Sequence, residues 1–230
     1  MQLALIATVV ALTVAVASAN NYGQQGTGDE LCWTFGAHAR TAMTVAGVAP
    51  YINGHIGVSP GTSYSGAFSL LDGDKLSAAQ ASPMAAHVVT MHAEAMAVDV
   101  FEPLEVEIGG KTFLPGFYAS TSAINLAGLI PVTLDADGDA DATFTFRAET
   151  TFITAALTSV VLTNGAQAKN VRWVLGTGAT FGAGSDIQGS ILAGTTCVFG
   201  ASAVLHGCAL AGTGVTFGSG VTIVNNFIAK

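Results

Sequence analysis

Acidic side chains are the most prominent residues in this sequence that could perform chemistry. Four aspartates alternate with other residues: Asp135, Asp137, Asp139 and Asp141. Carboxylate oxygens in such a run could bind Ca²⁺, but a solvated acidic turn explains the pattern more simply, and we favour it. Three further carboxylates, those of Glu102, Glu105 and Glu107, indicate a solvated face at the start of a strand.

The sequence offers little for catalysis or metal binding. His87 and His92 are five residues apart on a predicted helix, whereas helical metal motifs place two histidines four apart. No GxSxG, HExxH or glycine-rich phosphate loop occurs. We therefore predict that the protein is not an enzyme, has no metal site and needs no cofactor. A polysaccharide lyase or hydrolase would need a basic residue beside paired carboxylates or calcium, and the chain has only seven lysines and arginines.

The composition narrows the class of protein further. Of the 230 residues, 50% are hydrophobic, 10% are charged and 28 are glycine, whereas about 25% are charged in an average globular domain. The net charge of −8 argues against nucleic acid and anionic membranes as partners. Three cysteines, Cys32, Cys197 and Cys208, are too few for a disulfide scaffold. Cys197 should be a buried thiol, one disulfide involving Cys32 is possible, and one cysteine remains odd.

The first 19 residues differ from the rest. Residues 3–16 are apolar, and Ala17, Ser18 and Ala19 have the small-x-small form of a signal-peptidase site. We predict a signal peptide at 1–19, a mature domain at 20–230, secretion to the extracellular space, and no membrane contact after cleavage. A retained membrane anchor is the alternative, but the apolar core is short and no basic residues follow it.

The element that must position any functional side chain is an eighteen-residue repeat. It appears three times, as residues 176–193 (GTGATFGAGSDIQGSILA), 194–211 (GTTCVFGASAVLHGCALA) and 212–229 (GTGVTFGSGVTIVNNFIA). A short fixed period with glycine at its corners and few charges indicates a solenoid. Eighteen residues allow three short strands and three tight turns, so we predict a mainly β fold: a β-helix of triangular cross-section with about six coils.

Alternation along each strand sorts the faces of this β-helix. On the first strand, Ala179 and Phe181 should point inward and Gly178 and Thr180 outward, with Thr177 at the edge. The second face is mixed, with Asp186, Gln188 and His206 among its outward residues. The third has two adjacent apolar columns, Ile191/Ala209/Phe227 and Leu192/Leu210/Ile228. One of these columns must point outward and needs a cover.

A long helix is predicted at about 76–101. Its apolar residues recur at a spacing of three to four: Met84, Val88, Met91, Ala95 and Val98. Ser82 and Pro83 resemble an N-cap and first helical residue, which predicts a kink with an earlier turn. This helix is the candidate cover for the third face. Strand-like runs are predicted at 40–45, 51–58, 105–108, 112–113, 116–119, 132–134, 143–146, 152–154, 160–162 and 171–175.

Several segments resemble one known family in their sequence and their order. They are residues 57–62 (GVSPGT), 114–118 (LPGFY), 134–139 (LDADGD) and 161–168 (VLTNGAQA) continuing to Trp173. The chain is similar over about residues 36–228 to the discontinuous β-solenoid ice-binding (antifreeze) proteins of cold-dwelling microbes, algae and fungi. The resemblance implies a right-handed β-helix with the helix alongside, and an N-terminal coil stacked on the C-terminal one.

The resemblance also implies a function and a site. Some members carry Thr-Ala/Gly-x-Thr/Asn on the ice-binding face, and residues 41–44 (TAMT), 177–180 (TGAT) and 213–216 (TGVT) match it, while 195–198 (TTCV) departs from it. The expected protein is a secreted monomer whose partner is the ice surface. Its expected ice-binding residues are Thr41, Thr44, Thr177, Thr180, Thr195, Val198, Thr213 and Thr216. A secreted polysaccharide-binding or polysaccharide-degrading protein and a structural adhesin are the alternatives.

Overall fold

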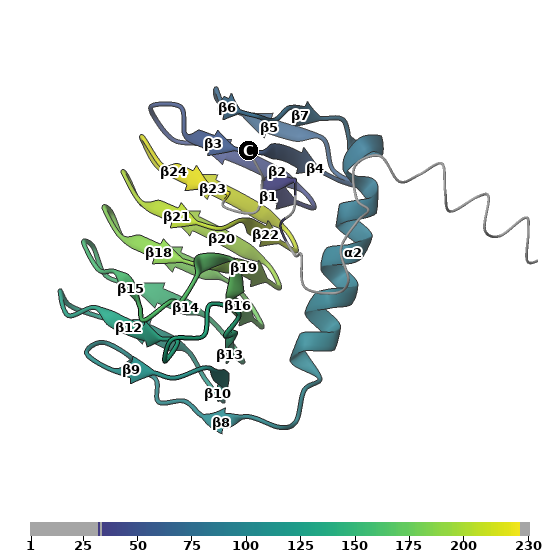
Figure 1. Ribbon diagram of the computed structural model, residues 1–230. Coiled ribbons are helices and arrows are strands. Elements are labelled where there is room, and N and C mark those ends of the chain that lie inside the picture. Colours follow the sequence, from purple (N-terminus) through teal and green to yellow (C-terminus); the bar gives the residue numbers. More distant parts are fainter. Residues whose placement is uncertain (1–31, 33, 226–230) are drawn as a thin grey trace, which may run out of the picture.

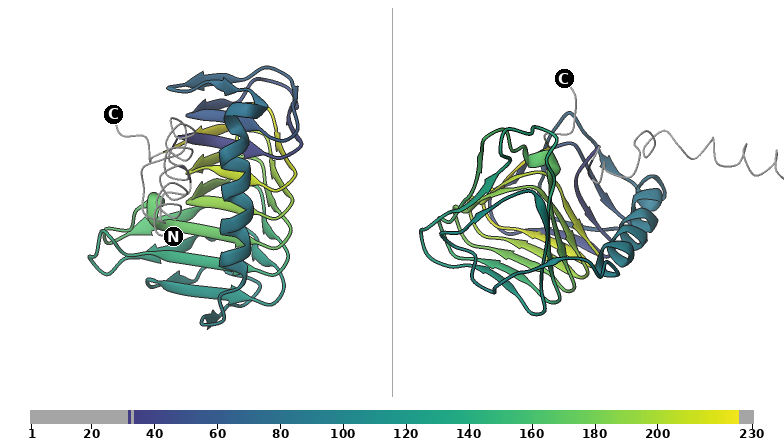
Figure 2. Two further views of the ribbon diagram at one scale, coloured as in Figure 1. Left: turned by 90° about the vertical axis from the view of Figure 1, so that its right-hand side faces the viewer. Right: turned by 60° about the horizontal axis from the view of Figure 1, so that its bottom comes forward.

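The protein is a parallel β-solenoid with one helix lying along it (Figure 1). The computed structural model describes residues 32 and 34–225. All strand pairs are parallel, and viewed close to its axis the stack is triangular (Figure 2, right). The predicted mainly β fold with a β-helix and one long helix is confirmed.

We name the three faces by their strands. Face A has nine strands in the order β7 (Lys75–Leu76), β4 (His55–Val58), β1 (Phe35–Ala39), β22 (Ala209–Ala211), β19 (Ser190–Ala193), β16 (Val171–Leu175), β13 (Phe144–Ala148), β10 (Gly116–Ser120) and β8 (Glu102–Pro103). Face B has seven strands in the order β11 (Ile124–Leu126), β14 (Phe152–Thr154), β17 (Ala179–Phe181), β20 (Thr196–Phe199), β23 (Gly214–Phe217), β2 (Ala42–Val45) and β5 (Ser63–Ser65).

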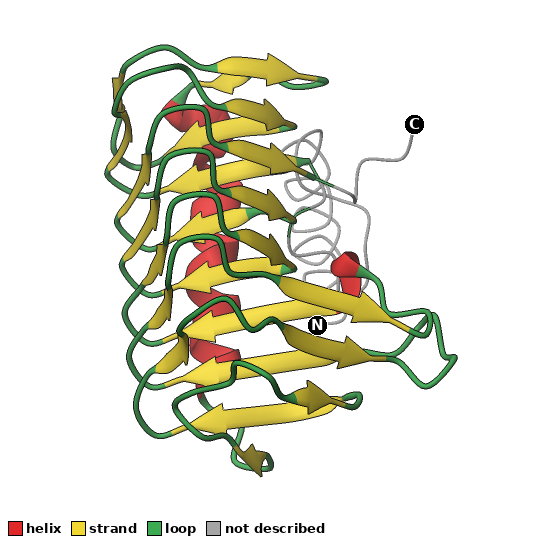
Figure 3. Cartoon of the chain, turned by 90° about the vertical axis from the view of Figure 1, so that its left-hand side faces the viewer, coloured by secondary structure: helices red, strands yellow, loops and turns green. Residues whose placement is uncertain are grey.

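Face C consists of two shorter sheets. The first contains β18 (Asp186–Gln188), β21 (Val204–His206), β24 (Thr222–Val224), β3 (Tyr51–Asn53) and β6 (Ser69–Leu71). The second contains β15 (Val160–Thr163), β12 (Val132–Asp135) and β9 (Thr112–Phe113). An isolated bridge between Ser159 and Asp186 joins them. Long loops of the second sheet protrude from one corner of the stack (Figure 3).

The stacking order is not the chain order. The N-terminal coils stand on the C-terminal ones, because β1, β2 and β3 pair with β22, β23 and β24. The helix α2 (Ala78–Met96) then carries the chain back to the opposite end, where β8 starts the remaining coils (Figure 2, left). At about 1.5 Å per residue its 19 residues span about 28 Å. The predicted stacking of N-terminal on C-terminal coil is therefore confirmed.

The repeating glycines stand where two coils approach most closely. A Cβ atom on Gly176 would lie 2.1 Å from the Glu149 carbonyl oxygen, and one on Gly194 would lie 2.3 Å from the Gly176 oxygen. Gly212 meets the Gly194 oxygen at 2.1 Å in the same way. These separations leave no room for any side chain, so glycine is required at this corner of each repeat.

Aromatic side chains fill the inside of the coils. Phe181, Phe199 and Phe217 are buried and follow one another with ring centroids 4.9 and 5.7 Å apart. Further along the axis, Trp173 stacks on Phe146 and Phe152 at 4.5 and 4.4 Å. In-register stacking therefore gives each coil the same large apolar neighbour above and below, which favours a continuous core.

The ends of α2 differ from the prediction of residues 76–101. Ser77 is the N-cap, in a capping box with Gln80, and the helix is continuous through Pro83. The prediction of an N-cap at Ser82 with a separate earlier turn is therefore wrong. The helix also ends earlier than predicted, at Met96. The Arg147 guanidinium donates hydrogen bonds to the carbonyl oxygens of Met96 and Val98, which would accept backbone N–H groups if the helix continued.

The helix covers face A through apolar contacts. Leu192 and Leu210 point outward from β19 and β22 and form a buried cluster with Val88 and Met91 of α2. Lower down, the His92 ring lies 2.8 Å from the carbonyl oxygen of Leu175. The prediction that one apolar column points outward and is covered by the helix is confirmed for these residues. Phe227 and Ile228 lie outside the described residues, as does the predicted signal peptide at 1–19.

A disulfide joins Cys32 to Cys208 on face A, which settles the partner of Cys32. Cys197 points into the core as a free thiol, as predicted, and burial raises its pKa to about 12. A thiol with such a pKa is inert toward oxidation and metals. Within the described residues, no helix is both long and apolar enough to span a membrane.

Some strands were missed or misplaced. Residues 105–108, predicted as a strand, form only an isolated bridge between Glu107 and Asn125, because the Glu107 carboxylate accepts backbone N–H groups of Gly109 and Ala127 and holds a turn. The strands β1, β5, β6, β7, β8 and β11 were not predicted. They lie in coils without the glycine-spaced repeat, where short segments carry little pattern of their own.

One buried ionisable group lies between face A and α2. The His38 ring is fully buried, its centroid is 5.9 Å from that of Phe35, and neither ring nitrogen makes a well-formed hydrogen bond within the described residues. Burial lowers the pKa of His38 from 6.5 to about 4; the Ala81 backbone offsets this in part and the Arg40 charge adds to it. The folded protein therefore holds this imidazole neutral.

This neutral histidine predicts a pH-dependent stability. Below pH 6.5 the unfolded chain protonates His38 while the folded chain resists protonation until about pH 4, so the stabilisation is complete above pH 6.5 and is lost as the pH falls between these values. We expect His38 to lower the free energy of unfolding by about 2 kcal/mol at about pH 5 relative to about pH 7.5. Urea unfolding at both pH values measures it.

The variant His38→Leu should lose this part of the pH dependence, since His38 pairs in register with Leu210 and leucine extends that outward column. The control is His87→Gln, at an exposed position of α2, which should keep the wild-type dependence. Equal pH slopes for wild type and His38→Leu would show that His38 is not the responsible group.

Candidate functional site

The eight predicted site residues come together on one side of the solenoid. Four of them form a column through consecutive strands of face B: Thr180, Val198, Thr216 and Thr44. The other four form a second column at the corner between faces A and B: Thr177, Thr195, Thr213 and Thr41. We call these the strand column and the corner column. Six of the eight side chains are exposed, and Val198 and Thr216 are half-buried.

Backbone hydrogen bonds hold the corner column in register. The amide nitrogen of Thr195 lies 2.6 Å from the Thr177 carbonyl oxygen, that of Thr213 lies 2.6 Å from the Thr195 oxygen, and that of Thr41 lies 2.7 Å from the Thr213 oxygen. Successive threonines are thus one strand spacing apart, about 4.7–4.9 Å. The last of these bonds joins residues 172 positions apart in the sequence, so the column depends on the N-terminal coil being in place.

Two hydroxyl groups take part in this ladder. Thr177 Oγ1 donates to the Thr150 carbonyl oxygen at 2.8 Å, and Thr195 Oγ1 donates to the Thr177 oxygen at 3.0 Å. The Thr213 and Thr41 hydroxyls make no such bond within the described residues, so they remain available to solvent. The corner column therefore presents methyl groups with fixed orientation at one end and free hydroxyls at the other.

The structure adds residues that the repeat did not reveal. Thr150 continues the corner column below Thr177, and Ile153 and Asn125 continue the strand column below Thr180. Above it, Ser65 pairs with Thr44. Thr150 and Ile153 were missed because the coil from Thr150 to Thr177 is longer than eighteen residues and includes a 3₁₀ turn, η1 (Ala168–Asn170). Asn125 and Ser65 were missed because their strands, β11 and β5, lie in coils without the repeat.

One detail of the prediction was wrong. Gly178, expected to be exposed, is buried, because Thr196 of the next coil lies over it. A Cβ atom on Gly178 would stand 2.5 Å from the Thr196 carbonyl oxygen and 3.0 Å from its hydroxyl. The outermost surface of this part of face B is therefore formed by Thr196 and the two threonine columns.

Face B is uncharged along both columns and their extensions. The charged residues nearest in sequence are Arg40 and Glu149, which are exposed and directly precede Thr41 and Thr150. By contrast, face C carries Asp186 and His206, whose side chains lie 3.3 Å apart, and face A is occupied in part by α2. Face B is thus the face whose described outward side chains are neither covered by α2 nor charged.

The aspartate run forms turns. The Asp135 carboxylate accepts the Asp137 amide at 2.9 Å and the Asn164 side-chain amide at 2.9 Å, and Asp139 accepts the Asp141 amide at 2.9 Å. The Asp137 amide and the Asn164 side chain lower the pKa of Asp135 below its ordinary value. Among the described residues, no three His, Cys, Asp or Glu side chains are grouped as a metal site requires. Each bonded aspartate holds its own turn, as the turn interpretation predicts.

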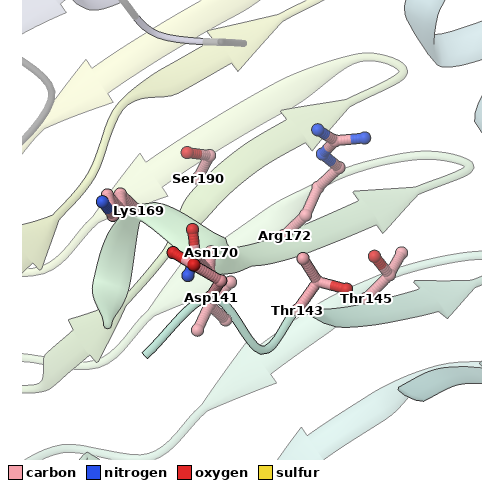
Figure 4. A pocket seen from close by; sticks show the side chains of 8 residues that line it. Asp141, Thr143, Thr145, Lys169, Asn170, Arg172 and Ser190 are labelled. Carbon is pink, nitrogen blue, oxygen red and sulfur yellow. The ribbon is translucent and has the colours of Figure 1, made fainter. Parts of the chain in front are cut away.

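A pocket of about 320 Å³ lies at the corner between faces C and A (Figure 4). Its lining mixes charges and hydroxyls: Asp141, Thr143, Thr145, Lys169, Asn170, Val171, Arg172 and Ser190. Figure 4 shows Lys169 and Arg172 pointing in different directions, so the two cations do not converge on one anion. The pocket is remote from face B and lacks the paired carboxylates of a glycosidase.

Comparison with known proteins gives a consistent result. A family model described as Ice-binding-like matches residues 37–226. An ice-binding protein of Nostoc sp. (strain HG1) is 42% identical over 88 residues, which are 38% of this chain and 32% of that protein. Ice-binding protein K3-B1 of Typhula ishikariensis is 28% identical over 186 residues, covering 70% of this chain and 75% of that protein. The match thus spans about a third of the length of the Nostoc relative.

A solved structure matches the whole architecture. The crystal structure of an ice-binding protein from the Antarctic ascomycete Antarctomyces psychrotrophicus superposes with a TM-score of 0.79 and 32% sequence identity. The superposition covers 88% of this chain and 100% of that one. The β-solenoid with its accompanying helix is therefore shared over nearly its full length.

The hydroxyl ladder gives a prediction for the corner column. Thr195→Val removes the donor to the Thr177 oxygen but keeps the shape of the side chain, so we expect the free energy of unfolding to fall by about 0.5–1.5 kcal/mol. Thr213→Val is the matched control and should stay within about 0.5 kcal/mol of wild type, since the Thr213 hydroxyl makes no such bond. Urea unfolding compares the two. An equal loss of stability in the two variants would contradict the prediction that only the bonded hydroxyls, those of Thr177 and Thr195, stabilise the stack.

Proposed function

The chain belongs to the ice-binding-like family, and from that premise we propose that it adsorbs to ice through face B and so inhibits ice growth and recrystallisation. The observation that carries this proposal is the pair of uncharged columns on one face, Thr180/Val198/Thr216/Thr44 and Thr177/Thr195/Thr213/Thr41, stacked in register. A periodic row of small side chains without charge is suited to a periodic solid surface.

The physical basis lies in what ice offers a protein. Its surface is a regular array of water molecules with neither pocket nor net charge, so a binder needs repeated weak contacts at a regular spacing. Threonine methyl groups order the water beside them, and hydroxyls such as those of Thr213 and Thr41 can hydrogen-bond to it. The backbone ladder fixes these groups before contact, so little conformational entropy is lost on adsorption and the weak contacts sum.

We further propose that the mature protein, residues 20–230, is secreted and acts as a monomer without metal, cofactor or catalysis. The aspartates of the run already serve their own turns, which supports a metal-free mode of action. No observation favours a polysaccharide-degrading or adhesive function over adsorption to ice.

Bulky substitutions test the proposed face. Thr180→Tyr and Thr216→Tyr place an aromatic ring above the strand column, so the flat surface can no longer approach ice and we expect most of the thermal hysteresis to disappear. Both side chains point away from the core, so stability should change by no more than about 0.5 kcal/mol. Thermal hysteresis and melting temperature are measured on each variant.

The chain supplies a matched control for this experiment. Thr222 points outward from β24 on face C, so Thr222→Tyr is the same substitution in the same coil as Thr216 on another face. It should keep wild-type activity. If Thr222→Tyr loses activity while the face B variants keep theirs, at unchanged melting temperatures, the ice-contacting face is face C.

Removal of divalent cations tests the metal-free mode of action. We expect the same thermal hysteresis and crystal shape with and without a chelator such as EDTA, because the bonds made by Asp135 and Asp139 hold their turns without a cation. A large loss of activity in the chelator that Ca²⁺ restores would revive the calcium interpretation of the aspartate run.

A further inference from the structure

Large apolar side chains are exposed next to the lower end of face B. Ile153 on β14 is 45% exposed, and Leu157, in the loop from β14 to β15, is 68% exposed. In the neighbouring coil, Leu129 and Ile130 are 72% and 64% exposed. Leu129 and Leu157 occupy equivalent positions of neighbouring coils, because each stands three residues before one of the paired residues Val132 and Val160. Large apolar side chains that gather on a surface generally mark a contact surface.

This patch is continuous with the strand column. Ile153 pairs in register with Thr180, so its side chain occupies the next place in the same outward row. Leu157 follows four residues later, between β14 of face B and β15 of face C. The strand column thus passes from Thr180 to the apolar Ile153 and then to Asn125, with no charged residue from Ile153 to Leu157.

The backbone at Leu157 supplies a second observation. Its φ is +62°, in the left-handed region, which a leucine rarely adopts because its Cβ crowds the following carbonyl group. The same corner in the next three coils is held by Gly184, Ser202 and Gly220, with φ of +66°, +57° and +68°. Two of these three are glycine, the residue that tolerates such a turn.

Leu157 therefore destabilises the folded state in two ways, because its backbone is strained and its apolar side chain is exposed. Its Cδ2 atom lies over Gly184, 2.7 Å from where a Cβ atom of that residue would stand, so the coil above accommodates the side chain. Packing does not explain it, because Leu157 remains 68% exposed. Strain kept at one position of a repeat commonly marks function.

We propose that the ice-contacting surface extends below the threonine columns onto this apolar patch, and that Leu157 and Ile153 are ice-contacting residues. This rests on the proposed function of face B. Apolar groups contribute by ordering adjacent water and by leaving bulk solvent on contact, which is the role assigned above to the threonine methyl groups. A second copy of this chain is the competing occupant of the patch.

The test replaces Leu157 by residues that suit its backbone. Leu157→Gly relieves the strain and removes the apolar side chain, so thermal hysteresis should fall while the melting temperature stays equal or rises by a few degrees, about 2–4 °C. Leu157→Asn, which also tolerates this φ, should lose activity likewise. Ser202→Gly also places glycine at this left-handed corner, two coils away from Leu157, and should keep full activity.

Three outcomes would overturn the proposal: full activity in Leu157→Gly, a loss of activity matched by a fall in melting temperature, or a dimer in solution, seen by light scattering, that Leu157→Gly dissociates. The Thr180→Tyr variant separates this inference from its premise. If Thr180→Tyr loses activity and Leu157→Gly does not, face B binds ice and the patch does not. If neither loses activity, the assignment of face B itself fails.

Discussion

Every level of this structure depends on the parallel hydrogen-bond ladder between successive coils. The ladder spaces the coils by about 4.7–4.9 Å, and that spacing brings the Gly176 oxygen within 2.3 Å of the place where a Cβ atom of Gly194 would stand. The corner must therefore be glycine. This corner fixes the register of each coil on the next, so equivalent residues of successive coils lie in columns. Phenylalanine therefore stacks on phenylalanine inside the solenoid, and threonine lies beside threonine outside. Core and surface are two consequences of one constraint.

The outward columns are where the faces differ, because the ladder does not restrict their side chains. On face A the outward residues Leu192 and Leu210 pack against α2. Arg147 donates a hydrogen bond to a carbonyl oxygen at the C-terminal end of this helix, and the neutral His38 side chain is buried beneath its first turns. Face C holds a mixed set that includes Asp186 and His206. Among the described residues, only on face B do the outward side chains neither pack against a helix nor form an ion pair. Its availability for a partner thus follows from how the other two faces are used.

The sequence predicted the parts of the fold that repeat. Gly176, Gly194 and Gly212 set the period, and the inward Phe181 and outward Thr180 follow from alternation alone. The same logic failed where the period is interrupted: the insertion between Thr150 and Thr177 concealed that both belong to one column. The C-terminal end of the helix was also beyond it, because Arg147, about fifty residues downstream, donates hydrogen bonds to the carbonyl groups there. Long-range contacts of single side chains leave no local pattern.

The hydroxyls of the corner column show why sequence alone could place the candidate face but not its working groups. Thr177 and Thr213 occupy equivalent positions of the repeat, yet the first hydroxyl donates to the coil below and the second does not. Thr195, which also lies in the repeat, donates to the Thr177 carbonyl oxygen below it. Identical residues of the repeat therefore differ in what they offer a partner. The binding properties of the face are set by its whole stack and not by the motif of any one coil.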